Sequence, residues 1–217
     1  MGRMMIWICA YRDWAKKIYY EASKQLDVRL LTSREELKNS IDLFKKGDKI
    51  FFLGWSWIVP NVLTENFECI CLHPSPLPKY RGGSPIQHQI INNESESAVT
   101  FFVMNEKIDA GMILFQRFFS LEGQLNEIFD RITYLGTLGL LEIVSGKTTN
   151  LVQNESQATF FKRRKPKQSE IKHDDFCKKP AREIYNKVRA LQDPYPNAFI
   201  TCSDGKKLFL KVVDYEK

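Results

Sequence analysis

The chain has 217 residues, of which 43% are hydrophobic, 27% charged and 12% aromatic, and its formal net charge is +6. This length suffices for one substantial core with a small appendage, and no apolar run approaches the roughly 20 residues that a membrane span requires. The N-terminal stretch has one basic residue and too short an apolar segment for a secretory signal. The five cysteines show no disulfide-like spacing, which fits a reducing compartment. We therefore expect a cytoplasmic protein without a membrane partner.

Apolar runs alternate with helical patterns through roughly residue 120, which predicts an α/β fold. We expect strands over 4–10, 28–31, 49–53, 67–72, 98–104 and 112–119. We expect helices over 14–26 with Asp13 as N-cap, 33–47 with a Ser33–Glu36 capping box, 84–92 with Pro85 in the first turn, and 125–144. Such alternation favours a Rossmann-like, mainly parallel twisted sheet with flanking helices, which binds ligands at the carboxyl ends of its strands.

The tail from about residue 151 differs in composition from the preceding chain. Its connector carries a basic run over 162–167, typical either of a solvated loop or of contact with phosphate or nucleic acid. A helix over 180–191 follows, then strands over 198–202 and 207–213 joined by a Ser-Asp-Gly hairpin signal. We therefore divide the chain into a main domain, 1–150, and a short C-terminal extension, 151–217. The paired tail strands and the apolar helix over 125–144 are compatible with a homodimer.

One histidine and one aspartate follow separate strands. His73 opens a Pro/Gly-rich loop that runs to Gln87, and Asp109 lies in the turn Ile-Asp-Ala-Gly over 108–111. Loops after strands are where α/β proteins expose reactive groups. A histidine positioned by a carboxylate is suited to moving protons near neutral pH. The pair indicates acid–base chemistry, with a structural loop histidine and a simple turn aspartate as the alternatives.

Five linked segments then resemble one known family. They are WSWIVP at 55–60, HPSPLPKYRG at 73–82 with PIQ at 85–87, AVTFFVM at 98–104, IDAG at 108–111 and VRALQDPYPNA at 188–198. In order and spacing they resemble the 10-formyltetrahydrofolate-dependent formyltransferases, the family of methionyl-tRNA formyltransferase. The resemblance covers most of the chain and implies a one-carbon transferase that passes a formyl group from folate N10 to an amine. It also implies that 1–150 is the catalytic domain and that 10-formyltetrahydrofolate is the co-substrate, with no metal.

The resemblance implies catalytic roles for His73 and Asp109. His73 would take the proton of the attacking amine, and Asp109 would orient the imidazole, stabilise the imidazolium or hold a relay water. Cys71 is a departure, because the family carries an asparagine two residues before this histidine. A thiol is a poor donor to a developing oxyanion, and loss of one such donor costs roughly 100- to 1000-fold in rate. We expect the protein to be active, either because another donor fills the gap or with a slower turnover.

Two further interpretations concern the cysteines. Cys69, Cys71 and His73 alternate and so share one side of a strand, which permits a metal site or a thiol nucleophile. The sequence offers no further ligand cluster, two cysteines in a buried strand usually pack as small apolar groups, and formyl transfer needs no covalent enzyme intermediate. We therefore expect no metal.

The resemblance also implies binding residues. The pterin pocket would be walled by Trp55, Ser56, Trp57 and Ile58 on one side and by Ile108 and Asp109 on the other. The acceptor would be bound by Arg12, Trp14, Ser75, Lys79, Tyr80, Arg81 and Tyr195. A helix N-terminus with an arginine is a good phosphate seat, which suits Arg12 and Trp14, and Tyr195 could stack. The alternatives are core packing for the tryptophans and a simple helix cap for the first loop.

The acceptor class follows from comparison within the family. The tRNA enzymes carry a further C-terminal barrel for which the chain, ending at Lys217, has no room. The glycinamide-ribonucleotide branch has a Gly-rich loop where this chain has Tyr-Arg-Asp-Trp at 11–14. We therefore expect a UDP- or dTDP-linked deoxy amino sugar of surface-polysaccharide or nonulosonic acid biosynthesis as acceptor, and no nucleic-acid partner. The alternatives are a truncated methionyl-tRNA formyltransferase and a catalytically inactive folate- or nucleotide-sugar-binding module.

Overall fold

The computed structural model describes residues 4–216, so the first residues of the N-terminal stretch considered above, 1–3, lie outside it. A central six-stranded sheet has the order β2-β1-β3-β4-β6-β7. Its strands are β1 (Ile6–Cys9), β2 (Val28–Leu31), β3 (Lys49–Leu53), β4 (Glu68–His73), β6 (Glu96–Val103) and β7 (Ile113–Ser120). The first four are parallel, and β6 and β7 are antiparallel additions at one edge. The expected Rossmann-like α/β fold is confirmed.

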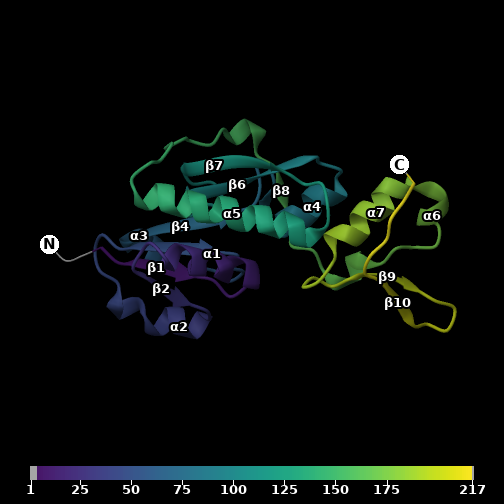
Figure 1. Ribbon diagram of the computed structural model, residues 1–217, viewed down its shortest axis with the longest axis horizontal. Helices are drawn as coiled ribbons and strands as arrows, with labels where there is room; N and C mark the ends of the chain where they lie inside the picture. The colour runs from purple at the N-terminus through teal and green to yellow at the C-terminus, as the bar shows by residue number, and fades with distance from the viewer. Residues whose placement is uncertain (1–3, 217) are drawn as a thin grey trace.

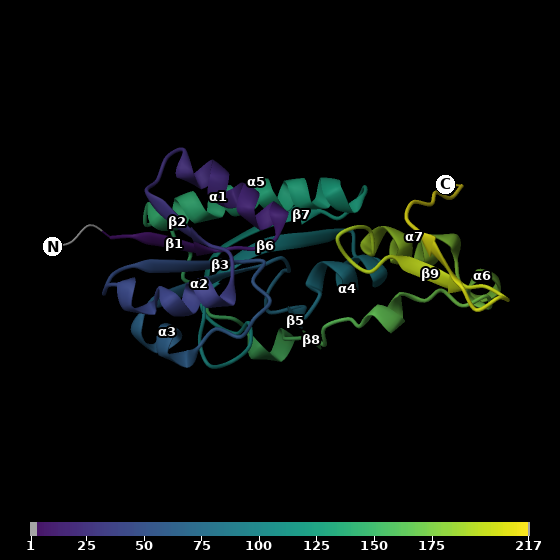
Figure 2. The same ribbon diagram turned by 90° about the horizontal axis from the view of Figure 1, so that it is seen from below.

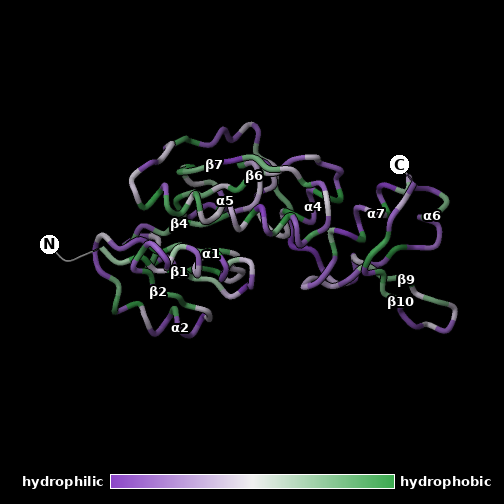
Figure 3. The backbone as a smooth tube through the Cα atoms, in the orientation of Figure 1, coloured by the Kyte–Doolittle hydropathy of each residue, from purple (hydrophilic) through white to green (hydrophobic). Residues whose placement is uncertain are grey.

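Helices cover both faces of the sheet. On one face α1 (Asp13–Ser23) and α5 (Leu125–Val144) pack side by side, and on the other lie α2 (Arg34–Asn39) and α3 (Asn61–Asn66) (Figures 1 and 2). Gly136 permits the close packing of α1 and α5, because a Cβ there would lie 2.5 Å from the Ile18 side chain. Hydrophobic residues follow the strands and the buried side of α5 (Figure 3), so the main core lies between the sheet and these helices.

Several helix boundaries differ from the sequence expectation, among them the end of α1, which is Ser23 and not residue 26. Asp13 is the first residue of α1 rather than its cap, since Arg12 occupies the cap position and Asp13 pairs with Lys16 at 2.8 Å. Ser33 caps α2 as expected, accepting a bond from the Glu36 amide at 3.1 Å. The helix nevertheless ends at Asn39 and not at 47. A 3₁₀ turn, η1 (Ile41–Leu43), follows and turns the chain so that Phe44 packs in the core against β1.

The C-terminal extension begins with a connector along the main domain, and its part from about residue 166 lies at the far end of the molecule from the N-terminus (Figure 1). Its elements are η2 (Glu155–Gln157), β8 (Phe160–Phe161), η3 (Pro166–Ser169), α6 (Asp175–Lys178), α7 (Ala181–Ala190) and the hairpin β9 (Ala198–Thr201) with β10 (Lys207–Leu210). A small core of Ile171, Val188, Leu191 and Ala198 holds it together. Helix α7 packs on α4 (Pro85–Ile91) of the main domain.

The connector between the two parts follows the surface of the main domain. Leu151 pairs with Ile113 of β7, and β8 pairs in parallel with the two-residue strand β5 (Arg81–Gly82). The connector is therefore hydrogen-bonded to the loop that follows β4. Among residues 4–216, no helix combines the length and the apolarity that crossing a membrane would take.

Candidate active site

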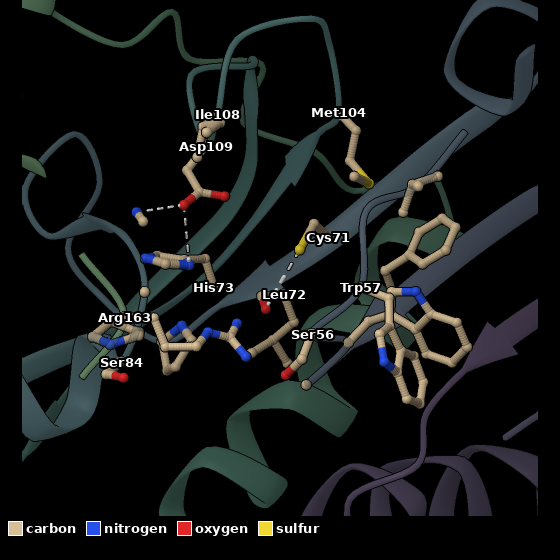
Figure 4. A pocket seen from close by; sticks show the side chains of 18 of the residues that line it. Ser56, Trp57, Cys71, Leu72, His73, Ser84, Met104, Ile108, Asp109 and Arg163 are labelled. Atoms are coloured by element: carbon tan, nitrogen blue, oxygen red, sulfur yellow. Dashed lines mark hydrogen bonds and ion pairs between the residues drawn. The ribbon is translucent and has the colours of Figure 1, made fainter. Parts of the chain in front are cut away.

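A cavity of about 590 Å³ opens at the carboxyl ends of β1, β3 and β4. The loops that follow these strands form its walls together with the turn between β6 and β7, as Figure 4 shows. Eleven residues that the sequence singled out line it: Arg12, Trp14, Trp55, Ser56, Trp57, Ile58, Cys71, His73, Ile108, Asp109 and Tyr195. The fold thus brings together residues from five separate segments, as expected for the crevice of an open α/β sheet.

His73 is the last residue of β4, and its surroundings define its tautomer. Its Nε2 lies 2.8 Å from the carbonyl oxygen of Tyr80. A carbonyl can only accept a hydrogen bond, so Nε2 carries the hydrogen and, in the neutral ring, Nδ1 is the basic nitrogen. Nδ1 lies 3.6 Å from Oδ2 of Asp109. A proton taken up at Nδ1 would therefore stand beside a carboxylate, which stabilises the imidazolium.

Asp109 reaches His73 from a tight turn between β6 and β7, and the two side chains face each other in Figure 4. Its φ of 52° is in the left-handed region, which aspartate tolerates better than most residues. Gly111 completes the turn, because a Cβ there would lie 1.6 Å from the carbonyl oxygen of Val103. The carboxylate Oδ2 also accepts a bond from the Gly82 amide at 2.7 Å. The aspartate is thus held from the loop after β4.

Cys71 lies on the same side of β4 as His73 and lines the cavity. Its Sγ donates a weak bond to the carbonyl oxygen of Leu72 at 3.7 Å. Burial, and secondarily the charge of Asp109, raises the pKa of the Cys71 thiol well above its usual value, so the group is a neutral thiol at neutral pH. It is therefore neither a strong donor nor a ready nucleophile. Among residues 4–216, no group of three or more His, Cys, Asp or Glu side chains could hold a metal ion.

The loop after β3 forms an aromatic wall. Trp55 and Trp57 meet edge to face at 4.7 Å, and Tyr11 packs on Trp57 at 4.4 Å. Two apolar side chains at the cavity are unusually exposed, Ile58 at 91% and Ile108 at 67%. Exposed apolar groups on both sides of one cavity are typical of a binding site for a flat, apolar ligand. The Nε1 of Trp55 is buried without a hydrogen-bond partner.

A second part of the cavity is cationic and aromatic. Arg12 donates to the Ser56 hydroxyl at 3.3 Å, and its guanidinium lies over the rings of Tyr11 and Tyr195, 5.1 and 5.6 Å from their centroids. Trp14 stacks on Phe129 at 5.8 Å. Burial raises the pKa of Tyr195, which the C-terminal extension contributes. Both parts of the chain therefore build this region.

Four expected acceptor-binding residues lie outside the cavity lining: Ser75, Lys79, Tyr80 and Arg81. The Ser75 hydroxyl is buried and donates to the carbonyl oxygen of Lys79, whose own side chain is exposed elsewhere. The Tyr80 hydroxyl donates to Glu94 at 2.6 Å. Arg81, 1% exposed, is bonded to Gln153 and Glu155. The side chains of Ser75, Tyr80 and Arg81 therefore make internal contacts and that of Lys79 is exposed, and a role of these four residues in acceptor binding stays a prediction.

Several lining residues were not among the predicted binding residues. Gln87 lies within one of the five family segments, and Arg163 and Arg164 lie within the basic run for which contact with phosphate was one alternative. Figure 4 shows Arg163 next to Ser84 on the His73 side of the cavity. The pairing of β8 with β5 places it there, and Gly83 makes the approach possible, since a Cβ would lie 2.5 Å from Arg163 Cα. The Gly-Gly pair at 82–83 was the available signal, but it does not say which segment packs against it.

The fold and the site together define an α/β protein with a cavity that holds a histidine–aspartate pair, His73 and Asp109. The family profile described as "Formyl transferase" matches residues 16–127, and "Formyl transferase, C-terminal domain" matches residues 165–217. The chain belongs to the formyl transferase family.

Sequence relatives of the chain include two methionyl-tRNA formyltransferases. That of Lactiplantibacillus plantarum is 36% identical over 185 residues, which are 82% of this chain and 56% of the relative. That of Staphylococcus aureus is 34% identical over 197 residues, which are 86% of this chain and 59% of the relative. The chain thus spans a little over half the length of these relatives.

Solved structures share the fold. Methionyl-tRNA formyltransferase from Clostridium thermocellum has a TM-score of 0.81 at 30% identity over 95% of this chain and 97% of its own. HypX from Aquifex aeolicus in complex with tetrahydrofolic acid has 0.80 at 21% identity over 97% and 38%. A 4-N formyltransferase from Francisella tularensis has 0.74 at 22% over 99% and 98%. The HypX and 4-N formyltransferase structures are 21% and 22% identical to this chain, so their likeness concerns the fold alone.

Proposed function

We propose that the protein transfers a formyl group from 10-formyltetrahydrofolate to a primary amine. The observation that carries the proposal is the His73–Asp109 pair, 3.6 Å apart, in a cavity walled on its other side by exposed apolar and aromatic residues. Family membership supports the reaction, and the pair supplies the proton transfer that the reaction requires.

The residues of this chain support the following steps. A neutral amine attacks the formyl carbon, and His73 Nδ1 accepts the proton that the amine loses, directly or through one water. Asp109 stabilises the imidazolium that forms. The C–N10 bond then breaks, and the imidazolium returns its proton to N10, which leaves tetrahydrofolate and a formamide. The Cys71 thiol offers the developing oxyanion little, so turnover should be slower than with an amide at that position.

The folate would lie against the loop over 55–58 and beneath Ile108. Its flat pterin ring matches the exposed side chains of Ile58 and Ile108 on the two sides of the cavity. The fold shared with a HypX structure that contains tetrahydrofolic acid is consistent with this placement.

For the acceptor we propose a UDP- or dTDP-linked deoxy amino sugar. Arg12, Arg163 and Arg164 line the cavity and suit a diphosphate, and the Tyr195 ring suits a base or sugar face. The fold shared with a 4-N formyltransferase of similar length supports this choice. Methionyl-tRNA is the second candidate, favoured by the names of the sequence relatives. A catalytically inactive binding module, suggested by Cys71, is the third.

The test incubates the purified protein with 10-formyltetrahydrofolate and each acceptor in turn: UDP- and dTDP-amino sugars and methionyl-tRNA. Mass spectrometry then follows the gain of one CO unit. Formylation of one sugar alone would establish the sugar acceptor, and formylation of methionyl-tRNA alone would establish the second candidate. Folate binding by calorimetry without turnover on any acceptor would identify a binding module.

We expect His73→Asn to lower kcat roughly 100- to 10,000-fold, because the amine then has no base. His173→Asn, at an exposed histidine of the extension, is the matched control and should keep the parental rate. A His73→Asn variant that folds and keeps the parental rate would show that the base is another group.

A further inference from the structure

One tripeptide contacts both catalytic groups. The carbonyl oxygen of Tyr80 accepts the hydrogen of His73 Nε2 at 2.8 Å, and the amide of Gly82 donates to Asp109 Oδ2 at 2.7 Å. The residue between them, Arg81, does not touch either group. Its guanidinium is buried and turned toward the connector.

The connector residue that meets Arg81 is Gln153, which is 6% exposed. Its Oε1 accepts bonds from Arg81 Nε and from a terminal guanidinium nitrogen, at 3.1 and 2.8 Å. Its Nε2 donates to the carbonyl oxygens of Asp109 and Gly111, at 2.9 and 2.7 Å. Glu155 binds the outer edge of Arg81 through two bonds at 2.9 and 2.8 Å. Arg81 thus orients the Gln153 side chain through its amide oxygen, and the amide nitrogen of Gln153 holds the backbone of the Asp109 turn.

The backbone of this turn decides where the Asp109 carboxylate lies. Asp109 has a positive φ, so the turn needs contacts that hold it in a sparsely populated conformation. The two carbonyls that Gln153 binds flank Ala110 and so fix both ends of the turn. A displacement of about 1 Å at a catalytic group can cost roughly 100-fold in rate. Only an amide serves here, because the group must accept from Arg81 and donate to two carbonyls at once.

We propose that Gln153, oriented by Arg81, is a positioning residue for Asp109, so that the connector completes the active site of the main domain. This inference rests on the proposed function for its kinetic consequence. The contact itself lies between residues 44 positions apart in the chain. The catalytic pair is therefore set by the tripeptide over 80–82 and by the connector acting together.

The experiment compares Gln153→Met with Gln157→Met. Gln157 is an exposed glutamine of the same connector, so it carries the same substitution without the contacts. We expect Gln153→Met to lower kcat about 10- to 100-fold while KM for the folate stays within about twofold. Without substrate, the Gly82 amide should exchange its hydrogen faster, because the Asp109 carboxylate no longer accepts it steadily. Gln157→Met should match the parent in all three measurements.

Two further variants separate positioning from general destabilisation. In an Asp109→Asn background, Gln153→Met should lower kcat little further, because its effect is transmitted through Asp109. If Gln153→Met fails to fold, Gln153→Glu replaces it, since the carboxylate still accepts from Arg81 but cannot donate to the turn. Parental kcat and parental Gly82 exchange in either folded variant would overturn the inference, as would a full additional loss in the Asp109→Asn background. The proposed function fails separately, if no amine is formylated, and the Gly82 measurement needs no substrate.

Discussion

Cys71 is the residue at which the sequence leads us to expect a departure from the family pattern. Its half-buried, neutral thiol lines the cavity two residues before His73 and donates only weakly to a carbonyl. We expect Cys71→Asn to raise kcat, by about 10-fold or more, because an amide would offer a strong donor to the oxyanion. Steady-state kinetics at saturating folate would measure the change.

Cys71→Ala is the control for this prediction, and it should remain close to the parental rate because the lost thiol contributes little. A stable Cys71→Asn variant that is slower than the parent would mean that another group already occupies the donor position and is displaced.

The thiols of β1 and β4 should make the protein sensitive to alkali, since Cys9 and Cys69 are buried and Cys71 is half-buried. Burial raises the pKa of Cys69 to about 12 and also raises those of Cys9 and Cys71. The folded state keeps these protons while the unfolded chain loses them above about pH 9, so the free energy of unfolding falls as pH rises through that range. Each such thiol contributes a slope of about 1.4 kcal/mol per pH unit.

Cys69→Val should make this slope shallower by up to about 1.4 kcal/mol per pH unit, measured by urea denaturation between about pH 8 and pH 10.5. Cys177→Val, at an exposed cysteine, should leave the slope unchanged. An unchanged slope for Cys69→Val would show that Cys69 already ionises normally in the folded protein.

The connector strand β8 pairs with β5 in the loop after β4 and so brings Arg163 and Arg164 to the cavity. It lies so close to the loop after β4 that a Cβ on Gly83 would meet the Arg163 backbone at 2.5 Å. We expect Gly83→Ala to displace the connector and so expose the basic run over 162–167 to trypsin. Limited proteolysis followed by mass spectrometry would show cleavage after Arg163 or Arg164.

Gly146→Ala is the control, because it strains a backbone with φ of +81° but meets nothing within 4 Å. It should lower the free energy of unfolding by about 1 kcal/mol while the connector stays protected. Equal cleavage in both variants would mean that global unfolding, not displacement, exposes the connector.

Elements with a strong internal pattern could be predicted from the sequence. The limits of β3 and α5 match because apolar residues in both change abruptly to polar or turn residues at the ends. The end of α2 could not be predicted, since it depends on Phe44 reaching a core built by other strands.

The candidate site shows the same division. The sequence placed His73 at the end of a strand and Asp109 in the turn between two others, but the contact between them depends on the antiparallel pairing of β6 with β4. The side chain of Arg81 turns away toward Gln153, a partner that spacing along the loop does not reveal. Arg163 needed the tertiary pairing of β8 with β5 before it could be placed at the cavity.

At the scale of the whole molecule, the C-terminal extension is fixed to the main domain by buried polar contacts. Arg189 of α7 is buried and donates to the carbonyl oxygens of Leu121 and Gly123, at 2.6 and 2.9 Å. We expect Arg189→Met to lower the free energy of unfolding by about 2–4 kcal/mol, because two carbonyls lose their donor. Chemical denaturation would measure it.

The matched control is Arg182→Met in the same helix. Arg182 is about half exposed and makes only surface contacts, an ion pair with Glu122 and a hydrogen bond to Asn93, so its loss should cost under about 1 kcal/mol. Equal losses for the two variants would show that the buried contacts of Arg189 do not hold the extension.

The tripeptide over 80–82 has a consequence for how substitutions propagate. The Tyr80 carbonyl binds the His73 imidazole and the Gly82 amide binds the Asp109 carboxylate, so a displacement of this segment moves both side chains together. Their mutual spacing would survive such a drift while their aim at the bound substrates changed. Substitutions elsewhere that displace this segment should therefore keep the His73–Asp109 distance but change the orientation of both side chains toward the substrates.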